Sequence, residues 1–322
     1  MVRLLQVGMG GMGETWLRAV LASIEAQYAG FVEVNEEIAR AQCQEHGLDD
    51  AKVYKTLPEA MGAVRADGVL IITPPRFHRE QSIQALEAGL PVLSEKPLAD
   101  TVEAAEDIVA TANRTGVLHM VAQNYRYSVP VQTLKSVLDS DKLGAVGSLA
   151  VQFFKGPHFG GFRDEMSYPL IIDMSIHHFD MMRDLLGREA ISIKGYSFNP
   201  VWSWYKGDAS ALVAMEFEGC LFASYSASWC ATGKETPWNG DWRFDCERGV
   251  VYLSEDKVFV QETGGEAAPV PAAQPQHTGQ AYLLHEFVQA ITTGIRPATT
   301  CQDNIRSLRI VFDTLRAMGV AR

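Results

Sequence analysis

The first part of the chain alternates short apolar runs with longer segments of helical periodicity. The apolar runs, which the pattern predicts as strands, are residues 3–7, 31–34, 69–73, 91–93 and 117–122. The helical segments between them are residues 12–27, 36–46, 78–88 and 101–115. Apolar strands that alternate with helices are typical of a parallel sheet covered on both faces. We therefore expect residues 1–122 to form a doubly wound α/β domain.

The pattern changes in the second part of the chain. A helical stretch at about 167–186 is followed by β-rich runs at 191–198, 211–217, 221–229, 242–246, 250–253 and 257–261. Short turn signals such as Glu218-Gly219 join them, which predicts antiparallel pairing. Two helical segments, 281–293 and 302–318, close the chain after an Ala-, Pro- and Gln-rich stretch that we expect to be an exposed loop. Residues 123–322 are thus predicted to be a second α/β domain with a mainly antiparallel sheet, and the final helices can pack back on the first domain.

Composition narrows the class of protein. The chain has 322 residues, 47% hydrophobic and 21% charged, which is enough for two separate cores. Its net charge of −11 argues against a broad basic surface for nucleic acid. The sequence lacks an apolar run long enough for a membrane span, and its first residues lack the order of a signal peptide. The scattered cysteines, without C-x-x-C spacing, indicate reduced thiols and predict a cytoplasmic protein.

A glycine fingerprint follows the first predicted strand. Gly8, Gly10 and Gly13 stand in G-x-G-x-x-G spacing before a helix. In this motif the first glycine makes a tight turn, the second lets the backbone approach a pyrophosphate, and the third lets helix and strand pack closely. The helix start, which includes Gly11 and Met12, offers free N–H groups and a positive dipole end to phosphates. We predict a dinucleotide site here rather than a glycine turn without a ligand.

The fingerprint also predicts an acid at the end of the second strand, about 20 residues on, for the ribose hydroxyls. Glu33 occupies this place. A carboxylate there repels a 2′-phosphate, so NAD is favoured over NADP. Alternatives stay open, because Asn35 could hold the ribose, Arg40 could tolerate a phosphate, and Glu33 could be a solvated strand-end acid.

Two further strand ends carry candidate cofactor contacts. Thr73 and Pro74 end an apolar run, and ligands of open α/β sheets lie beside the carboxyl ends of strands. His78 begins the next helix and is included as a cofactor contact, although a histidine there is more often exposed or capping. Glu95 and Lys96 follow another short strand and are predicted to contact the cofactor.

Lys96 is also the candidate proton carrier. The proline after it restricts its backbone conformation and fixes its direction. Beside a cationic nicotinamide ring the ammonium form of a lysine is disfavoured, which suits it to work as a base or proton shuttle. On the Glu-Lys-Pro tripeptide alone, an ordinary surface lysine would be the better interpretation.

A second group of candidates lies on the predicted helix at 167–186. Asp173, His177 and Asp180 are spaced i, i+4, i+7 and share one face if this segment is helical. Asp173 can then orient His177 or bind substrate, while His177 exchanges a proton near neutral pH. We expect His178 to be structural and Asp180 to pair with Arg183. Zinc is a rival ligand, but no third ligand at recognisable spacing is evident, so we predict no metal here; a purely structural polar helix face is the other alternative.

Taken together, these features resemble the glucose-fructose oxidoreductase / inositol dehydrogenase family, often written Gfo/Idh/MocA. The resemblance covers essentially the whole chain. It rests on the glycine fingerprint, Ile-Ile-Thr-Pro-Pro-x-x-His, Ala-Gly-Leu-Pro-Val-Leu-Ser-Glu-Lys-Pro-Leu, Asn124-Tyr125-Arg126-Tyr127 and Asp-x-x-x-His. It implies a Rossmann domain and a C-terminal α/β domain whose open antiparallel sheet packs against another subunit, giving a homodimer or homotetramer. By position, Lys96 resembles the catalytic lysine, Asp173 a substrate-positioning residue and His177 the acid/base candidate.

The chain departs from the family before the Asp-x-x-x-His helix, where members often carry glycines and this chain carries none at residues 167–172. The preceding loop holds His158 and Arg163, which we expect to contact substrate together with Tyr125 and Arg126. Three later tryptophans can stack on a sugar ring or pack in the core: Trp229, Trp238 and Trp242.

The sequence thus predicts an NAD(P)-dependent oxidoreductase. It would transfer a hydride between nicotinamide and a carbinol or carbonyl carbon of a sugar, cyclitol or related polyol, with Lys96 and His177 handling the hydroxyl proton. Two alternatives follow from the resemblance. Some relatives use tightly held NAD as a transient oxidant for glycoside cleavage, and a few are nucleotide-sensing regulators, whose signature would be loss of the lysine or histidine that this chain retains.

Overall fold

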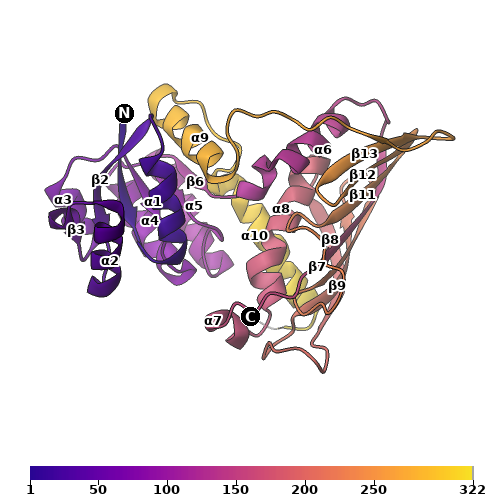
Figure 1. The fold of residues 1–322 in the computed structure, drawn as a ribbon, viewed down its shortest axis with the longest axis horizontal. Helices are drawn as coiled ribbons and strands as arrows, with labels where there is room; N and C mark the ends of the chain where they lie inside the picture. The colour runs from indigo at the N-terminus through magenta and orange to yellow at the C-terminus, as the bar shows by residue number, and fades with distance from the viewer. Residues whose placement is uncertain (321–322) are drawn as a thin grey trace. The chain divides into compact units, whose positions relative to one another are not determined.

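The chain divides into two compact units in a computed structural model that describes residues 1–320 (Figure 1). The first unit comprises Met1–Asn124 and Gln276–Leu308, and the second comprises Tyr125–Pro275 and the segment that begins at Arg309. The last helix, α10 (Cys301–Ala317), contributes residues to both units.

The first unit contains a six-stranded parallel sheet in the order β3-β2-β1-β4-β5-β6. The strands are β1 (Val2–Val7), β2 (Ala26–Val32), β3 (Val53–Tyr54), β4 (Gly68–Ile71), β5 (Val92–Ser94) and β6 (His119–Val121). Strands β4, β5 and β6 are buried along their whole length, so both faces of the sheet are covered, as predicted. The strand order reverses between β1 and β4, which is where open α/β sheets bind their ligands.

Helices connect these strands. They are α1 (Gly11–Leu21), α2 (Glu36–His46), α3 (Leu57–Ala63), α4 (His78–Glu87) and α5 (Val102–Thr115), with short 3-10 turns at Asp50–Lys52 and Pro75–Phe77. A further 3-10 turn, Asn124–Tyr127, follows β6, and α9 (Gly279–Thr293) returns to this unit near the end of the chain. Local chemistry sets several of their ends. The side chains of Asn35 and Thr101 accept backbone N–H groups at the starts of α2 and α5, and Gly47 and Gly116 end these helices in the left-handed conformation.

One boundary in this unit was predicted wrongly. The expected helix at 12–27 ends at Leu21, and β2 begins at Ala26 rather than at residue 31. The sequence from Ala26 to Gly30 has little intrinsic β preference, but its pairing with β1, which starts at Val2 opposite Ala26, makes it a strand.

The second unit contains an eight-stranded sheet in the order β14-β13-β12-β11-β7-β10-β9-β8. The strands are β7 (Val146–Phe154), β8 (Ala190–Phe198), β9 (Ser210–Phe217), β10 (Leu221–Ser228), β11 (Asp241–Cys246), β12 (Gly249–Ser254), β13 (Lys257–Glu262) and β14 (Ala268–Pro269). All pairs are antiparallel except β10 with β7. The mainly antiparallel sheet is therefore confirmed, although its strand β7 was not predicted.

Helices cover one face of this sheet. They are α6 (Val129–Asp139), a π-helical turn at Leu170–Met174 and α8 (Ser175–Leu186). The short helix α7 (Phe162–Glu165) has no buried residue. Helix α6 packs on β12 and β13, and the α8 residue Phe179 packs edge-on against Tyr225 of β10. The opposite face, which we call the open face, exposes large hydrophobic side chains, among them Tyr196 (77%), Leu212 (50%) and Phe222 (57%).

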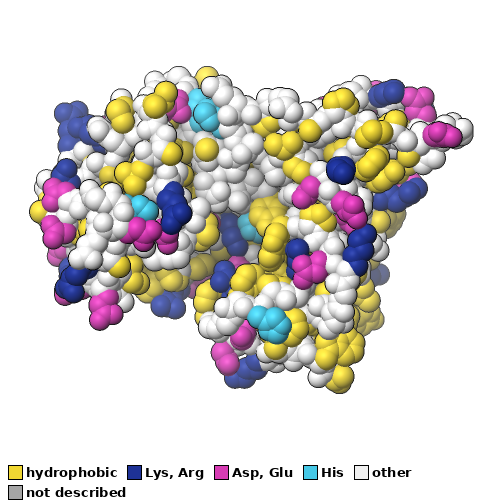
Figure 2. Space-filling view, in the orientation of Figure 1, with side chains coloured by type: hydrophobic (Ala, Val, Ile, Leu, Met, Phe, Trp, Pro, Cys, Tyr) yellow, Lys and Arg dark blue, Asp and Glu magenta, His cyan; other side chains and the backbone are white. Residues whose placement is uncertain are grey.

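The distribution of surface charge agrees with the expectation that the protein has no broad basic surface. Acidic and basic side chains are interspersed on the face shown in Figure 2. Among residues 1–320, no helix is long and apolar enough to cross a bilayer. The five cysteines are all unpaired, which fits the expected reduced thiols; the cytoplasmic location stays a prediction.

Candidate active site

The three glycines of the loop between β1 and α1 have two different roles: two are required by close packing, and one leaves room for a ligand. A Cβ atom on Gly8 would lie 2.8 Å from the Ile72 carbonyl oxygen, and one on Gly13 would lie 2.5 Å from that of Gly8. On Gly10 a Cβ would meet only the Ile38 side chain, at 3.7 Å. The protein itself therefore excludes side chains at Gly8 and Gly13, while the space above Gly10 is left for a ligand.

A buried glutamine, Gln6, holds this loop in place. Its Nε2 donates to the carbonyl oxygens of Gly8 and Gly13, each at 2.9 Å, and its Oε1 accepts from the Tyr28 hydroxyl at 2.6 Å. We did not predict this role. The available signal was a glutamine in the apolar run Leu4–Val7, directly before the fingerprint; in the structure this residue is fully buried.

Glu33 is tied to the same loop. One carboxylate oxygen accepts from the Met9 N–H and the other from the Asn35 N–H, each at 2.9 Å. A carboxylate has about four acceptor positions, so both oxygens can still accept ribose hydroxyls. The Asn35 side chain instead caps α2 by accepting from the N–H groups of Glu37 and Ile38, so Asn35 does not replace Glu33 at the ribose.

The loop fits the pyrophosphate of a dinucleotide. Gly10 precedes α1 without a side-chain cap, and the Gly13 N–H donates to the Gly10 carbonyl oxygen. No side chain therefore caps the N–H groups of Gly11 and Met12, which can bind a phosphate, and the positive end of the helix dipole points the same way. Together with the open space at Gly10 and the acid at Glu33, the observed arrangement is what NAD requires.

His78 does not present a ring atom to the cofactor. The ring is fully buried, with Nδ1 2.9 Å from the Pro97 carbonyl oxygen and Nε2 2.8 Å from that of Thr73. Burial lowers the pKa of His78. Each ring nitrogen thus faces a carbonyl oxygen, one in the loop after β4 and one in the loop after β5, and the neutral ring donates to one of them. We replace the predicted cofactor contact with this positioning role. The Thr73 hydroxyl donates to Gln81 at 2.6 Å.

Glu95 fixes the strand end that carries Lys96. The indole N–H of buried Trp16 donates to one Glu95 oxygen at 2.7 Å, and the backbone N–H of Lys96 donates to the other at 3.2 Å. Lys96 is the partly exposed residue in an otherwise buried run, Val92 to Ala99. The structure therefore gives Glu95 a positioning role, and its predicted contact with cofactor stays a prediction.

In the second unit, Asp173 lies on the π-helical turn and not on α8 itself. Its Oδ2 accepts from Nε of Arg163 at 2.6 Å. The Arg163 guanidinium also lies over the rings of Phe159 and Phe162, at 5.0 and 4.7 Å from their centroids. The loop before the helix thus brings a cation to Asp173, a pairing that we did not predict. π-helical turns are rare and concentrate at functional sites.

His177 lies beside this ion pair. Its ring is buried and stacks on Tyr125, with centroids 4.1 Å apart. Burial raises the pKa of Tyr125, and the negative charge of Asp173 adds to this effect. Tyr125, Arg163, Asp173 and His177 therefore form one polar cluster within the second unit, which we call the Asp-His cluster.

Arg126 is not available to a substrate. It is buried and binds Asp180 through two parallel hydrogen bonds of 2.5 and 2.6 Å, with Asp184 at 3.4 Å from its Nη1. The predicted substrate contact is corrected to a buried ion pair. Arg183, the expected partner of Asp180, is 4.0 Å from it and binds Glu189 more closely, at 2.7 Å.

The remaining predicted residues separate into exposed and buried groups. His158 is exposed and stacks on Trp204 with centroids 3.8 Å apart. His178 is buried, bonds the Tyr225 hydroxyl at 2.9 Å and has its pKa lowered by burial to about 4, which confirms its structural role. Trp229 and Trp242 are core residues, whereas Trp238 is 39% exposed.

Two family models match the chain. One, described as an oxidoreductase family with an NAD-binding Rossmann fold, matches residues 2–123, and the C-terminal domain model of the same family matches residues 131–252. The rhizopine catabolism protein MocA of Rhizobium meliloti is 30% identical over 313 residues, which are 96% of this chain and 92% of that protein. The chain belongs to the Gfo/Idh/MocA oxidoreductase family.

Other Gfo/Idh/MocA relatives are named dehydrogenases. Inositol 2-dehydrogenase 1 of Paenarthrobacter aurescens is 30% identical over 87% of this chain and 82% of that protein. An oxidoreductase of Agrobacterium radiobacter, solved with NAD⁺, L-tartaric acid and magnesium, has the same fold, with a TM-score of 0.90 at 18% identity over 100% of this chain and 97% of that one.

The protein is therefore an NAD-dependent oxidoreductase that acts on CH–OH groups. The redox-assisted glycosidase and the non-enzymatic sensor receive no support from the relatives named here.

The different roles of Gly13 and Gly10 predict different effects of an alanine substitution at each. Gly13→Ala should destabilise the protein by roughly 1–3 kcal/mol, because its Cβ meets a backbone oxygen. Gly10→Ala should leave stability nearly unchanged but weaken NAD binding at least ~10-fold, because its Cβ enters the space for the pyrophosphate. Thermal unfolding and calorimetric titration with NAD⁺ measure the two effects. NAD binding to Gly10→Ala at wild-type affinity would contradict this division.

The buried ion pair makes a second prediction. Arg126→Met should lower the free energy of unfolding by about 3–5 kcal/mol, because Asp180 stays buried without its principal partner. The double variant Arg126→Met/Asp180→Leu should recover much of this loss in denaturant unfolding. If Arg126 instead served the substrate, Arg126→Met would keep wild-type stability and raise KM.

Proposed function

We propose that this oxidoreductase transfers hydride between NAD and a carbinol carbon of a cyclic polyol, a sugar or a cyclitol. The observation that carries the proposal is the Asp-His cluster. A carboxylate, a guanidinium, an imidazole and a phenol stand together there, on the unit that does not hold the nucleotide loop.

This cluster suits a substrate with several adjacent hydroxyl groups. Each hydroxyl can donate one hydrogen bond and accept others, so it is best bound by neighbouring acceptors and donors such as Asp173 and Arg163. Aromatic rings nearby can pack on the C–H face of the ring. The partly exposed Trp238 is a candidate, because its ring lies 6.2 Å from that of Phe159, over which Arg163 lies. The name inositol 2-dehydrogenase, carried by the relative from Paenarthrobacter aurescens, supports the same class.

The site residues divide the chemistry between them. NAD, when bound at the glycine loop, supplies the hydride acceptor. Lys96 takes the hydroxyl proton as a general base when the hydride leaves the carbinol carbon. His177 exchanges this proton with solvent, and Asp173, held by Arg163, fixes the substrate hydroxyls. The stack on Tyr125 limits the rotation of the His177 ring.

Loss of the lysine amine tests this assignment. Lys96→Ala should lower turnover roughly 10²–10⁴-fold, because the hydroxyl proton loses its acceptor, while the affinity for NAD⁺ stays near wild type. The assay is NADH formation from NAD⁺ across cyclitols, aldoses and sugar acids. Lys52→Ala, an exposed lysine of the same unit, is the control and should keep full activity.

Two outcomes would overturn the proposal at different points. Wild-type turnover in Lys96→Ala would remove the lysine from the mechanism. A wild-type enzyme that binds NAD⁺ yet is inactive across the panel, and with the corresponding ketones and NADH, would show that the polyol class is wrong.

We also propose that the open face binds a second copy of the chain. Tyr196 and Leu212 are cross-strand neighbours on β8 and β9, and Phe222 is exposed on β10 beside them. Ala214 and Ser224 lie on the same face, together with two charged residues, Lys194 opposite Ala214 and Glu216 opposite Phe222, so the surface is apolar with charges between its large side chains. Such surfaces are typical of subunit interfaces.

Charges on this face should separate the subunits. Tyr196→Asp/Leu212→Asp should reduce the oligomer to a monomer, because two carboxylates cannot be buried unpaired in an interface. Size-exclusion chromatography with light scattering measures the mass. Ile24→Asp, at a hydrophobic residue of the first unit that is 89% exposed, is the control. A wild-type protein that is already monomeric, or a double variant with wild-type mass, would refute the interface.

A further inference from the structure

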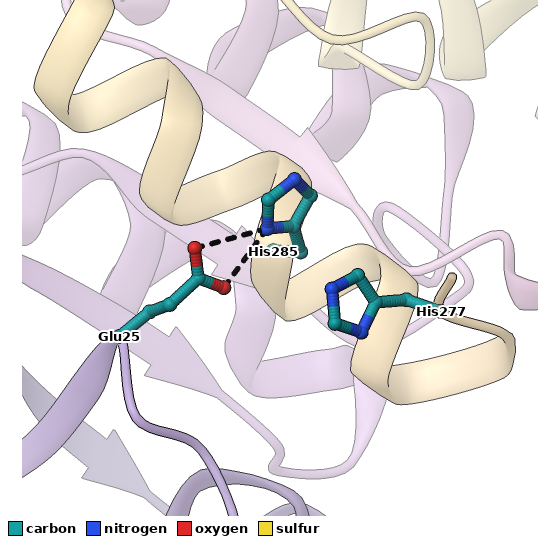
Figure 3. A group of neighbouring side chains, drawn as sticks. All are labelled: Glu25, His277 and His285. Atoms are coloured by element: carbon teal, nitrogen blue, oxygen red, sulfur yellow. Dashed lines mark hydrogen bonds and ion pairs between the residues drawn. The ribbon is translucent and has the colours of Figure 1, made fainter.

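Three potential metal ligands meet in the first unit, away from the residues considered so far. Glu25 lies in the turn between α1 and β2, His277 in the loop before α9, and His285 on α9 (Figure 3). One ligand atom from each lies within 4.8 Å of those of the other two. Nδ1 of His285 is 3.1 and 2.9 Å from the two Glu25 oxygens, and the two imidazole rings stack with centroids 4.8 Å apart.

We propose that Glu25, His277 and His285 form a binding site for a divalent transition metal ion of the zinc type. Two imidazole nitrogens and one carboxylate oxygen are a donor set that zinc, nickel and copper take, whereas calcium and magnesium need more oxygen ligands. Neutral imidazoles need lose no proton to bind, and the single carboxylate offsets part of the metal charge. A water molecule completes a tetrahedral site with three protein ligands.

The geometry requires only side-chain movement. Ligand atoms bound to one tetrahedral zinc ion lie roughly 3.3 Å apart. The Glu25–His285 separation is already in this range, so a rotation of His277, which lies on a loop, closes the site. Gln289, one turn after His285 on α9, donates to a Glu25 oxygen at 3.5 Å and helps to orient the carboxylate, as outer-sphere partners of metal ligands do.

A second group of similar composition does not make a comparable site. Glu14, Glu45 and His46 also have their ligand atoms close together. Arg18, however, lies 2.5 Å from Glu14 and 3.4 Å from Glu45, so a guanidinium already neutralises these acids and would repel a metal ion. The cluster around His285 contains no such cation among its described contacts.

The position of the site indicates a structural role. Glu25 directly precedes β2 and Glu33 directly follows it, so the metal and the ribose site lie at opposite ends of this strand, about 20 Å apart. The metal would join chain segments 260 positions apart, the α1–β2 turn and α9. We therefore expect it to stabilise the first unit without entering the redox reaction.

The test is a titration of the full-length protein, freed of metal by chelator, with ZnCl₂. Calorimetry should show one ion per chain, and zinc should raise the Tm by roughly 2–4 °C. Glu25→Gln and His277→Ala should each weaken zinc binding roughly 100-fold or more, and Gln289→Ala about 10-fold. The His277→Ala variant keeps the Glu25–His285 pair, so we expect this variant to fold like the wild type. His46→Ala is the matched control and should bind zinc like the wild type.

Two results would overturn the site. One is zinc binding by the wild type no tighter than by Glu25→Gln and His277→Ala. The other is loss of binding in His46→Ala instead. NAD⁺ affinity, measured on the same samples, should be equal in all of them, so failure of the metal site is distinguishable from failure of the proposed oxidoreductase chemistry.

Discussion

The buried hydrogen bond between Trp16 and Glu95 is the constraint on which the nucleotide-binding unit depends. It joins α1, whose first turn faces the phosphates, to the strand end that carries Lys96. Glu95 also accepts from the Lys96 backbone, so the position of the lysine is set from the same helix that sets the cofactor. A hydrogen bond that excludes water in this way is costly to break, because either partner would be left buried and unsatisfied.

The second unit uses a buried ion pair for the same purpose. Arg126 adjoins Tyr125 in sequence, and Asp180 follows His177 by one helical turn on α8. The Arg126–Asp180 pair therefore holds the two segments whose side chains, Tyr125 and His177, stack on each other. In both units, a charged group that the sequence assigned to a ligand, Glu95 in the first and Arg126 in the second, positions the residues beside it.

The sequence predicted what periodicity and spacing encode. It identified the parallel sheet, the antiparallel sheet and the glycine loop, because these repeat local rules of pattern and turn chemistry. Sequence-based prediction failed where tertiary contacts determine a strand boundary or the partner of a side chain. The first residues of strand β2 are extended because they pair with β1. His78 and Arg126 bind groups of the protein that are distant in sequence, and residue spacing does not predict such contacts. The cluster of Glu25 with two histidines has no sequence signature either, because Glu25 and His285 are 260 positions apart.

The central claim is that NAD binds next to Lys96 in the first unit, and that α1 positions both of them. A crystal structure of the protein with NAD⁺ bound tests it most directly. The account predicts the pyrophosphate on the α1 N-terminus above Gly10, the adenosine ribose hydroxyls on Glu33, and the nicotinamide ring beside Lys96. A nicotinamide ring bound away from Lys96, with the pyrophosphate in place, would contradict it.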